Sequence, residues 1–173
     1  MTEHIVKRYR DEGTRRHIIH RFREIAGLLP DRVATRIADG DAWRELTYAE
    51  LRATVDRVAQ GVLDLGLEPG DRVGLFANNC PEWTEVDLGV NTARGVVVPL
   101  YATSTPEQIA HIVTDSRMRA IVVGGQSEAE RVLAAREIAP MPPVVVLEDY
   151  PDRPDDVRVY EQLLADPTPA VDE

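Results

Sequence analysis

The chain has 173 residues, of which 43% are hydrophobic and 29% are charged. This length and composition predict one domain with a short annex and a buried core, and no apolar run approaches the ~20 residues that span a bilayer. The net charge of −10 argues against nucleic acid as a partner, because phosphate neutralisation needs clustered Lys and Arg. The first residues lack an apolar stretch of the secretory type, so we expect a cytoplasmic protein.

The first predicted element is an amphipathic helix in the segment 1–30. From Thr14 to Pro30, apolar residues recur at helical spacing, namely Ile18, Phe22, Ile25 and Leu29. The opposite face of this helix carries four arginines. We expect the apolar stripe to dock on the core of the protein, with peripheral contact to an anionic membrane as the alternative.

A β-hairpin and a long helix are predicted next. Val33–Ile37 and Trp43–Leu46 flank an Asp-Gly pair that suits a tight reversal. Thr47 then begins a helix, because its side chain can accept a bond from the backbone of Glu50 and the Glu50 carboxylate can return the bond. An apolar stripe follows along this helix, which ends at Gly66.

Strands and helices alternate through the central part of the chain. The predicted strands and helices are, in order, strand 72–77, helix 81–94, strand 96–100, helix 105–116, strand 120–123, helix 127–138 and strand 144–147. The strands are continuously apolar, which is typical of a parallel sheet buried on both faces. We therefore predict an α/β fold with a doubly wound, mostly parallel sheet and helices on both faces, preceded by the N-terminal helix and the hairpin.

Helix caps and composition complete the predicted organisation. Thr105 and Ser127 each begin a capping box, with Gln108 and Glu130 three residues later. Residues 31–150 are assigned to one α/β subdomain, and residues 151–173 to an acidic, Pro-rich segment. In that segment Val159–Leu164 is expected to add a short strand or a helical turn, and the tail 166–173 is expected to be a linker that is cut short.

Open parallel sheets bind ligands beyond the carboxyl ends of their strands. This rule places Asn78, Asn79, Tyr101 and Thr103 near a substrate cleft, together with the Gly124–Gly125 pair. The chain has neither a Gly-x-Gly-x-x-Gly nor a Gly-x-x-x-x-Gly-Lys phosphate cradle. Asparagines at such positions are more often helix caps, and a Gly pair is more often a turn.

The sequence shows no constellation for catalysis. The three serines lie outside any Gly-x-Ser-x-Gly motif, and the close pair His17 and His20 lacks carboxylates at a metal-ligand spacing. Cys80, before Pro81 at a predicted helix start, is either a reactive thiol or, as we favour, a small apolar residue. The residues alone therefore predict an α/β domain without a catalytic residue, a cofactor-binding residue or a metal ligand.

Five blocks, in order, resemble the adenylate-forming enzyme superfamily. They are Leu-Thr-Tyr-Ala-Glu-Leu at 46–51, Leu-Gly-Leu-Glu-Pro-Gly-Asp-Arg-Val at 65–73, Asn-Asn-Cys-Pro-Glu-Trp at 78–83, a block at 89–100 that ends in Pro-Leu, and Tyr-Ala-Thr with its capped helix at 101–109. The run Pro-Leu-Tyr-Ala-Thr is similar to the long-chain fatty acyl-CoA synthetase branch. The resemblance covers roughly residues 15–150.

The resemblance implies a full-length enzyme that joins a long-chain fatty acid to coenzyme A, using ATP and Mg and releasing AMP and pyrophosphate. The family's phosphate loop, acidic ATP–Mg block and C-terminal lysine come later in such enzymes, so no catalytic or nucleotide-binding residue is transferred to this chain. The resemblance thus implies an N-terminal fragment that ends before the phosphate loop, binds no cofactor itself, forms a structural wall of the substrate cleft and has the remainder of the enzyme as its partner.

Two further expectations accompany this interpretation. The alternative to a ligase fragment is a free-standing, non-catalytic interaction module with the same fold. If a neighbouring subdomain is missing, apolar surface is exposed, and exposed apolar surface favours association. We therefore expect the isolated chain to self-associate.

Overall fold

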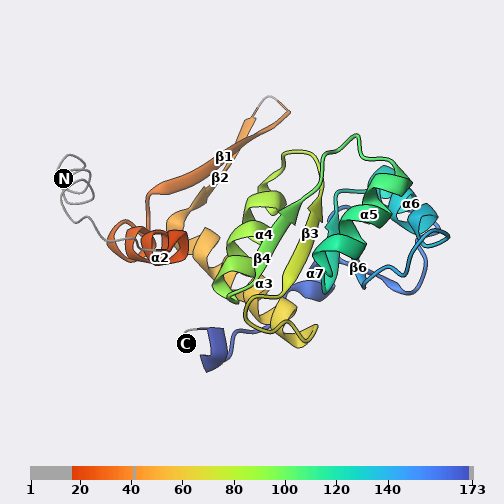
Figure 1. Ribbon diagram of the computed structural model, residues 1–173. Coiled ribbons are helices and arrows are strands. Elements are labelled where there is room, and N and C mark those ends of the chain that lie inside the picture. Colours follow the sequence, from red (N-terminus) through yellow and green to blue (C-terminus); the bar gives the residue numbers. More distant parts are fainter. Residues whose placement is uncertain (1–16, 41, 172–173) are drawn as a thin grey trace.

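Five parallel strands form the central sheet of the computed structural model, which describes residues 17–40 and 42–171 (Figure 1). From one edge of the sheet to the other, the strands are β4 (Val96–Pro99), β3 (Arg72–Phe76), β5 (Ala120–Val123), β6 (Val144–Val146) and β7 (Val157–Val159). Each adjacent pair is parallel. The chain therefore runs from β3 outward to β4, returns to the other side of β3 at β5, and continues in sequence order to β7.

Helices cover both faces of this sheet. One face packs against α3 (Tyr48–Asp64), α4 (Pro81–Thr92) and α7 (Tyr160–Leu163), and the other against α5 (Pro106–Ser116) and α6 (Gln126–Ala135). Successive strand residues alternate between the two cores, so Leu75 lies in the first and Phe76 in the second. The predicted doubly wound α/β fold is confirmed, and the central strands are continuously apolar because both of their faces are buried.

The edge strand β4 departs from this pattern. Val96 is 48% exposed and Pro99 is exposed as well. Among the described residues, no strand pairs with the outer side of β4, so its side chains are covered less than those of the central strands. The expectation that all four predicted strands are buried on both faces is therefore wrong for β4.

The N-terminal helix, α2 (Ile18–Leu28), docks on the outer side of α3. Phe22 and Ile19 are buried there against Leu51 and Val55. The predicted docking is confirmed, but the buried stripe is shifted, because Ile18 is 59% exposed and Ile19 takes its place. The predicted start at Thr14 lies outside the described residues. Within the described part of the chain, no helix is both long and apolar enough to cross a membrane.

The predicted hairpin is present as β1 (Val33–Asp39) and β2 (Ala42–Thr47). It forms a separate two-stranded antiparallel sheet that projects from the rest of the chain at the top of Figure 1. Trp43 on this hairpin is 62% exposed. An ion pair of 3.8 Å between Arg44 and Glu82 connects the hairpin to α4.

Two of the three predicted capping boxes are confirmed. The side chains of Thr47 and Thr105 accept from the backbone three residues later, and the N3 side chain returns each bond. The box at Ser127 is wrong, because the extended backbone of Gly125 already starts α6 and Ser127 lies inside the first turn. The carbonyl and hydroxyl oxygens of Ser127 accept instead from Arg131.

The end of the described chain packs against α3. Tyr160, Leu163 and Val171 are buried in the same core as α3 and α4, and the backbone N–H of Ala165 donates to the carbonyl of Arg57 over 3.3 Å. The helical turn α7 confirms the short element that was expected at Val159–Leu164, and the strand β7 comes directly before it. The interpretation as a linker is wrong for residues 166–171, where Thr168 donates to Gln60 and Val171 is buried. Gln60 lies 108 positions before Thr168 in the sequence, so local composition gave no sign that this tail would pack on α3. The division of the chain at residues 30 and 150 stays a prediction.

Candidate functional site

Two hollows lie where the loops leave the carboxyl ends of the strands. The larger, here called the acidic hollow, has a volume of about 670 Å³ and is lined by Asn78, Cys80, Glu82, Gly124, Gly125, Gln126, Ser127, Glu128, Leu147, Glu148, Asp149 and Glu161. The smaller, here called the Tyr101 hollow, measures about 470 Å³ and is lined by Tyr101, Thr103, Ser104, Glu107, Gln108, His111 and Ile112. Both volumes are in the range of small-molecule sites.

The structure separates the four residues that were predicted near a substrate cleft. Asn78 lines the acidic hollow, whereas Tyr101 and Thr103 line the other one. Asn79 is exposed and lines neither. The separation follows from topology: the loop after β3 leads into α4 on one face of the sheet, and the loop after β4 leads into α5 on the opposite face. Contact of these residues with a substrate stays a prediction.

The acidic hollow does not fit the phosphate groups of ATP. Five carboxylates and no Lys or Arg stand among its lining residues, so a polyphosphate would be repelled. The backbone of the first turn of α6 lines this hollow, and the N-cap Gly125 makes no side-chain cap there. The positive end of one helix dipole is too weak to offset five negative charges. A Cβ on Gly124 would lie 3.3 Å from the Cβ of Ala77, so this glycine serves close packing. We therefore derive no chemical step through ATP at this hollow.

The metal-binding potential of the described residues is likewise limited. They hold no group of three or more His, Cys, Asp or Glu side chains that could bind a metal ion. His17 and His20 meet edge-on, with ring centroids 6.5 Å apart. One carboxylate of the acidic hollow, Asp149, accepts from Arg153 over 2.7 Å, and this bond lowers the pKa of Asp149. Asp149 therefore carries its negative charge at neutral pH.

Cys80 is the N-cap of α4, and Pro81 is the first residue of that helix. The thiol is free and half-buried, and burial raises its pKa. A reactive thiol requires a lowered pKa. The structure therefore favours our interpretation of Cys80 as a small apolar residue.

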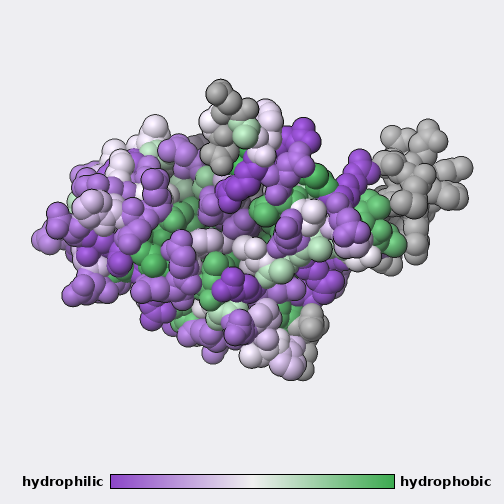
Figure 2. Space-filling view, turned by 180° about the vertical axis from the view of Figure 1, so that it is seen from behind, coloured by the Kyte–Doolittle hydropathy of each residue, from purple (hydrophilic) through white to green (hydrophobic). Residues whose placement is uncertain are grey.

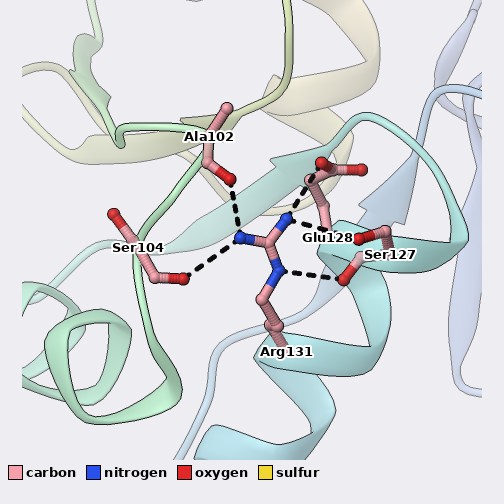
Figure 3. Close-up of polar contacts among 5 residues, drawn as sticks. All are labelled: Ala102, Ser104, Ser127, Glu128 and Arg131. Carbon is pink, nitrogen blue, oxygen red and sulfur yellow. Dashed lines mark hydrogen bonds and ion pairs between the residues drawn. The ribbon is translucent and has the colours of Figure 1, made fainter.

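Arg131 of α6 holds the loop between the two hollows, a role that sequence reasoning missed (Figure 3). Its Nη1 donates to the carbonyl oxygens of Ala102 over 2.6 Å and Ser104 over 3.2 Å. Its Nη2 lies 3.0 Å from the Glu128 carboxylate, and the guanidinium lies 4.8 Å from the centre of the Phe76 ring. The spacing of Glu128 and Arg131 on a helix predicts their ion pair, but no local pattern indicates that a guanidinium would reach the carbonyl groups of the distant loop.

A buried polar pair joins α7 to α4. The Tyr160 hydroxyl donates to Glu85 over 2.6 Å, and both residues are 6% exposed. Burial raises the pKa of Glu85, and burial together with the neighbouring carboxylate raises the pKa of Tyr160. Two residues that line the acidic hollow are close to this pair in sequence: Glu82 comes three residues before Glu85, and Glu161 directly follows Tyr160. The pair therefore fixes one side of the hollow.

These observations define a class of protein: an open, doubly wound α/β domain whose loops gather at the carboxyl edge of a parallel sheet, where such domains bind ligands. The family model described as AMP-binding enzyme matches residues 22–172. The chain therefore belongs to the AMP-binding enzyme family, as its sequence blocks predicted.

Curated relatives and solved structures agree with this assignment. The long-chain-fatty-acid–CoA ligase ACSBG1 of Rattus norvegicus is 33% identical over 126 residues, which cover 72% of this chain and 18% of the relative. The long-chain-fatty-acid–CoA ligase FadD15 of Mycobacterium tuberculosis is 32% identical over 58% of this chain and 16% of the relative. The chain thus spans about a fifth of the length of the relatives it matches.

Two solved structures illustrate the shared fold. The acetoacetyl-CoA synthetase of Streptomyces lividans superposes with a TM-score of 0.75 at 22% identity, covering 87% of this chain and 25% of that one. The acyl-CoA synthetase of Brucella canis gives a TM-score of 0.69 at 23% identity, covering 80% of this chain and 25% of that one. At these identities the likeness establishes the fold alone.

Proposed function

We propose that this chain supplies the N-terminal α/β part of a long-chain fatty acid–CoA ligase and forms a structural wall of its substrate cleft without catalysing the reaction alone. The observation that carries the proposal is the carboxyl edge of the sheet. It presents two open hollows but no phosphate-binding loop and no cationic group in the acidic one. The named relatives that match this edge are long-chain-fatty-acid–CoA ligases about six times as long as the matched part, which is 18% and 16% of their length.

The Tyr101 hollow is the part of the wall that suits an acyl substrate. Tyr101 is 86% exposed, while Arg131 fixes the backbone of the loop on either side of Thr103. An exposed aromatic side chain on a fixed loop is ready to contact an apolar ligand without a further cost of ordering the backbone. ATP, Mg and coenzyme A would then bind to groups of the remaining enzyme, which is the partner that this proposal requires.

The proposal is tested by isothermal titration and ¹⁵N NMR on the 173-residue chain. Titration of Mg-ATP is expected to give no binding heat, because the acidic hollow repels phosphate. A non-hydrolysable long-chain acyl-adenylate analogue is expected to shift the amide signals of Tyr101, Thr103 and His111. Micromolar binding of Mg-ATP would show that the phosphate site is built from this chain. An unchanged spectrum at millimolar analogue would refute the role of this loop in the wall.

The expected self-association and the cytoplasmic location stay predictions. Large apolar side chains are exposed at Trp43, Val96 and Tyr101, and on the face seen from behind, hydrophobic atoms lie in separate patches among hydrophilic ones (Figure 2). Light scattering over a hundredfold range of concentration measures self-association directly. A constant monomer mass at the highest concentration would exclude it.

A further inference from the structure

A third hollow, here called the α2–α4 hollow, lies at the opposite end of the strands from the acidic hollow. It has a volume of about 510 Å³ and is formed by α2, the end of α4, the first residue of β4 and Val171. That volume is within the range of small-ligand sites. Nothing in the proposed ligase function uses it.

The ionisable side chains that line this hollow are all basic, and its other polar residues, Asn91 and Thr92, are neutral. Arg23, Arg94, His17 and His20 stand among its lining residues, and no Asp or Glu does. Arg23 is bound to Asp56 over 2.8 Å and to the carbonyl of Val171 over 3.0 Å, so it builds the wall. The exposed Arg94, with the two exposed histidines, faces solvent at the rim. In a chain whose net charge is −10, this is a local site for an anion.

The floor of the hollow is apolar, and it contains one unused polar group. Ile19 is 7% exposed and Val171 is 5% exposed, while Val96 at the edge of the sheet is 48% exposed. The hydroxyl oxygen of Thr92 is buried and has no hydrogen-bond partner within the described residues. Leaving such a group unpaired costs free energy, so a small shift of the neighbouring side chains that lets a bound headgroup pair with this hydroxyl is favoured.

We propose that the α2–α4 hollow binds a small amphiphilic anion. The negative headgroup, a carboxylate or a phosphate monoester, lies against Arg94, His20 and the hydroxyl of Thr92. Its apolar chain lies along Ile19 and Val96. Two sources supply this shared chemistry, a free amphiphile in solution and an acidic lipid in a membrane.

The test uses octyl phosphate as the probe, below its micelle concentration, and follows the amide signals of the 173-residue chain by ¹⁵N NMR. The decisive variant is Arg94→Asn, and its matched control is Arg117→Asn. Both arginines are exposed and both have left-handed backbone, with φ of 63° and 52°, which Asn tolerates well. Only Arg94 lines the hollow. Loss of its charge is expected to weaken binding about fivefold, and the control is expected to bind like the wild type.

Further arms separate the proposal from its competitors. Thr92→Val is expected to weaken the binding of octyl phosphate. It should not reduce the thermal stability of the protein, because it removes a buried unpaired hydroxyl. Octanol has the apolar chain without the negative headgroup, and inorganic phosphate has the negative charge without the chain. Both are expected to bind more weakly than octyl phosphate. Equal affinity of the Arg94→Asn and Arg117→Asn variants, equal affinity for octanol, or shifts confined to the Tyr101 hollow would each overturn the proposal.

The source of the ligand is assigned by sedimentation with vesicles. Vesicles of phosphatidylglycerol that retain the wild type but lose the Arg94→Asn variant identify a membrane lipid as the ligand. If vesicles of phosphatidylglycerol do not retain the wild type, while octyl phosphate binding is intact, the ligand is a free amphiphile. Because octyl phosphate carries no adenylate, failure at this hollow leaves the acyl-adenylate experiment on the Tyr101 hollow unaffected, and the two proposals fail separately.

Discussion

Gly61 is the position at which a single methyl group should separate the end of the described chain from α3. A Cβ at this glycine would lie 1.6 Å from the carbonyl oxygen of Leu163 and 2.7 Å from its carbonyl carbon. These are backbone atoms, so a side-chain rotation cannot relieve the clash. The Gly61→Ala substitution must therefore move the α7 segment away from α3.

The magnitude follows from what that movement uncovers. Leu163 is 2% exposed and Tyr160 is 6% exposed, and complete loss of one such buried side chain costs about 1.5–3 kcal/mol. Partial exposure of both residues gives a loss of roughly 3–5 kcal/mol, offset by about 1 kcal/mol because Ala favours a helix over Gly. The expected net loss is about 2–4 kcal/mol in the free energy of unfolding.

Urea unfolding followed by circular dichroism measures this loss. The matched control is Gly27→Ala, which also places Ala in a helix but has no atom within 4 Å of the new Cβ. The control should gain about 0.5–1 kcal/mol. If the α7 segment detaches in the folded state, the Gly61→Ala variant should also show a lower m-value, because less surface remains to be exposed on unfolding. Equal stability of both variants would mean that this segment does not rest on α3, and the reasoning would fail.

Two more predictions concern buried polar groups. Burial raises the pKa of Glu85, so its contribution to stability is complete below its unfolded pKa near 4.5 and is lost as the pH rises through the folded pKa. In urea unfolding, the free energy of unfolding of Glu85→Gln should therefore equal that of the wild type at pH 4 and exceed it by about 1 kcal/mol at pH 8. The same difference between the two proteins at both pH values would contradict this. Arg131→Met should increase the hydrogen-exchange rate of the Ser104 amide at least tenfold, which corresponds to about 1.4 kcal/mol of local opening. The control Arg136→Met removes a half-exposed ion pair to Asp156 and should leave the exchange rate of Ser104 unchanged. Equal exchange rates in both variants would exclude the role of Arg131 in holding the loop.

Local patterns predicted the elements that leave a local signal in the sequence. The capping boxes at Thr47 and Thr105 depend on residues three positions apart and were predicted correctly. The central strands pair with strands that are distant in sequence, but burial on both faces leaves a continuous apolar run that a single sequence reveals. Ser127 was assigned to a cap incorrectly, because a Gly in extended backbone two residues earlier began the helix first. The strand Val157–Val159 has only three residues, one of them exposed Arg158, so its apolar pattern was too short to decide between strand and turn.

The candidate site was predicted less completely because it depends on the order of the strands. The carboxyl-end rule correctly marked Asn78 and Tyr101 as edge residues, but the sequence does not show that helices on opposite faces carry their loops apart. Arg131 and Tyr160 were missed for a related reason. Each bonds to a partner at least 27 positions away in the loop or in α4, and a single sequence gives no direct signal for such pairs.

The contact between the last described residues and α3 has a consequence for synthesis on the ribosome. Thr168 bonds to Gln60 across 108 positions, so α3 emerges from the ribosome long before the segment that covers it. At a translation rate of 5–20 residues per second, that interval is about 5–20 seconds. Throughout it, the apolar surface of α3 around Gly61 is open on the nascent chain, which makes this surface a target for chaperones that bind unfinished proteins.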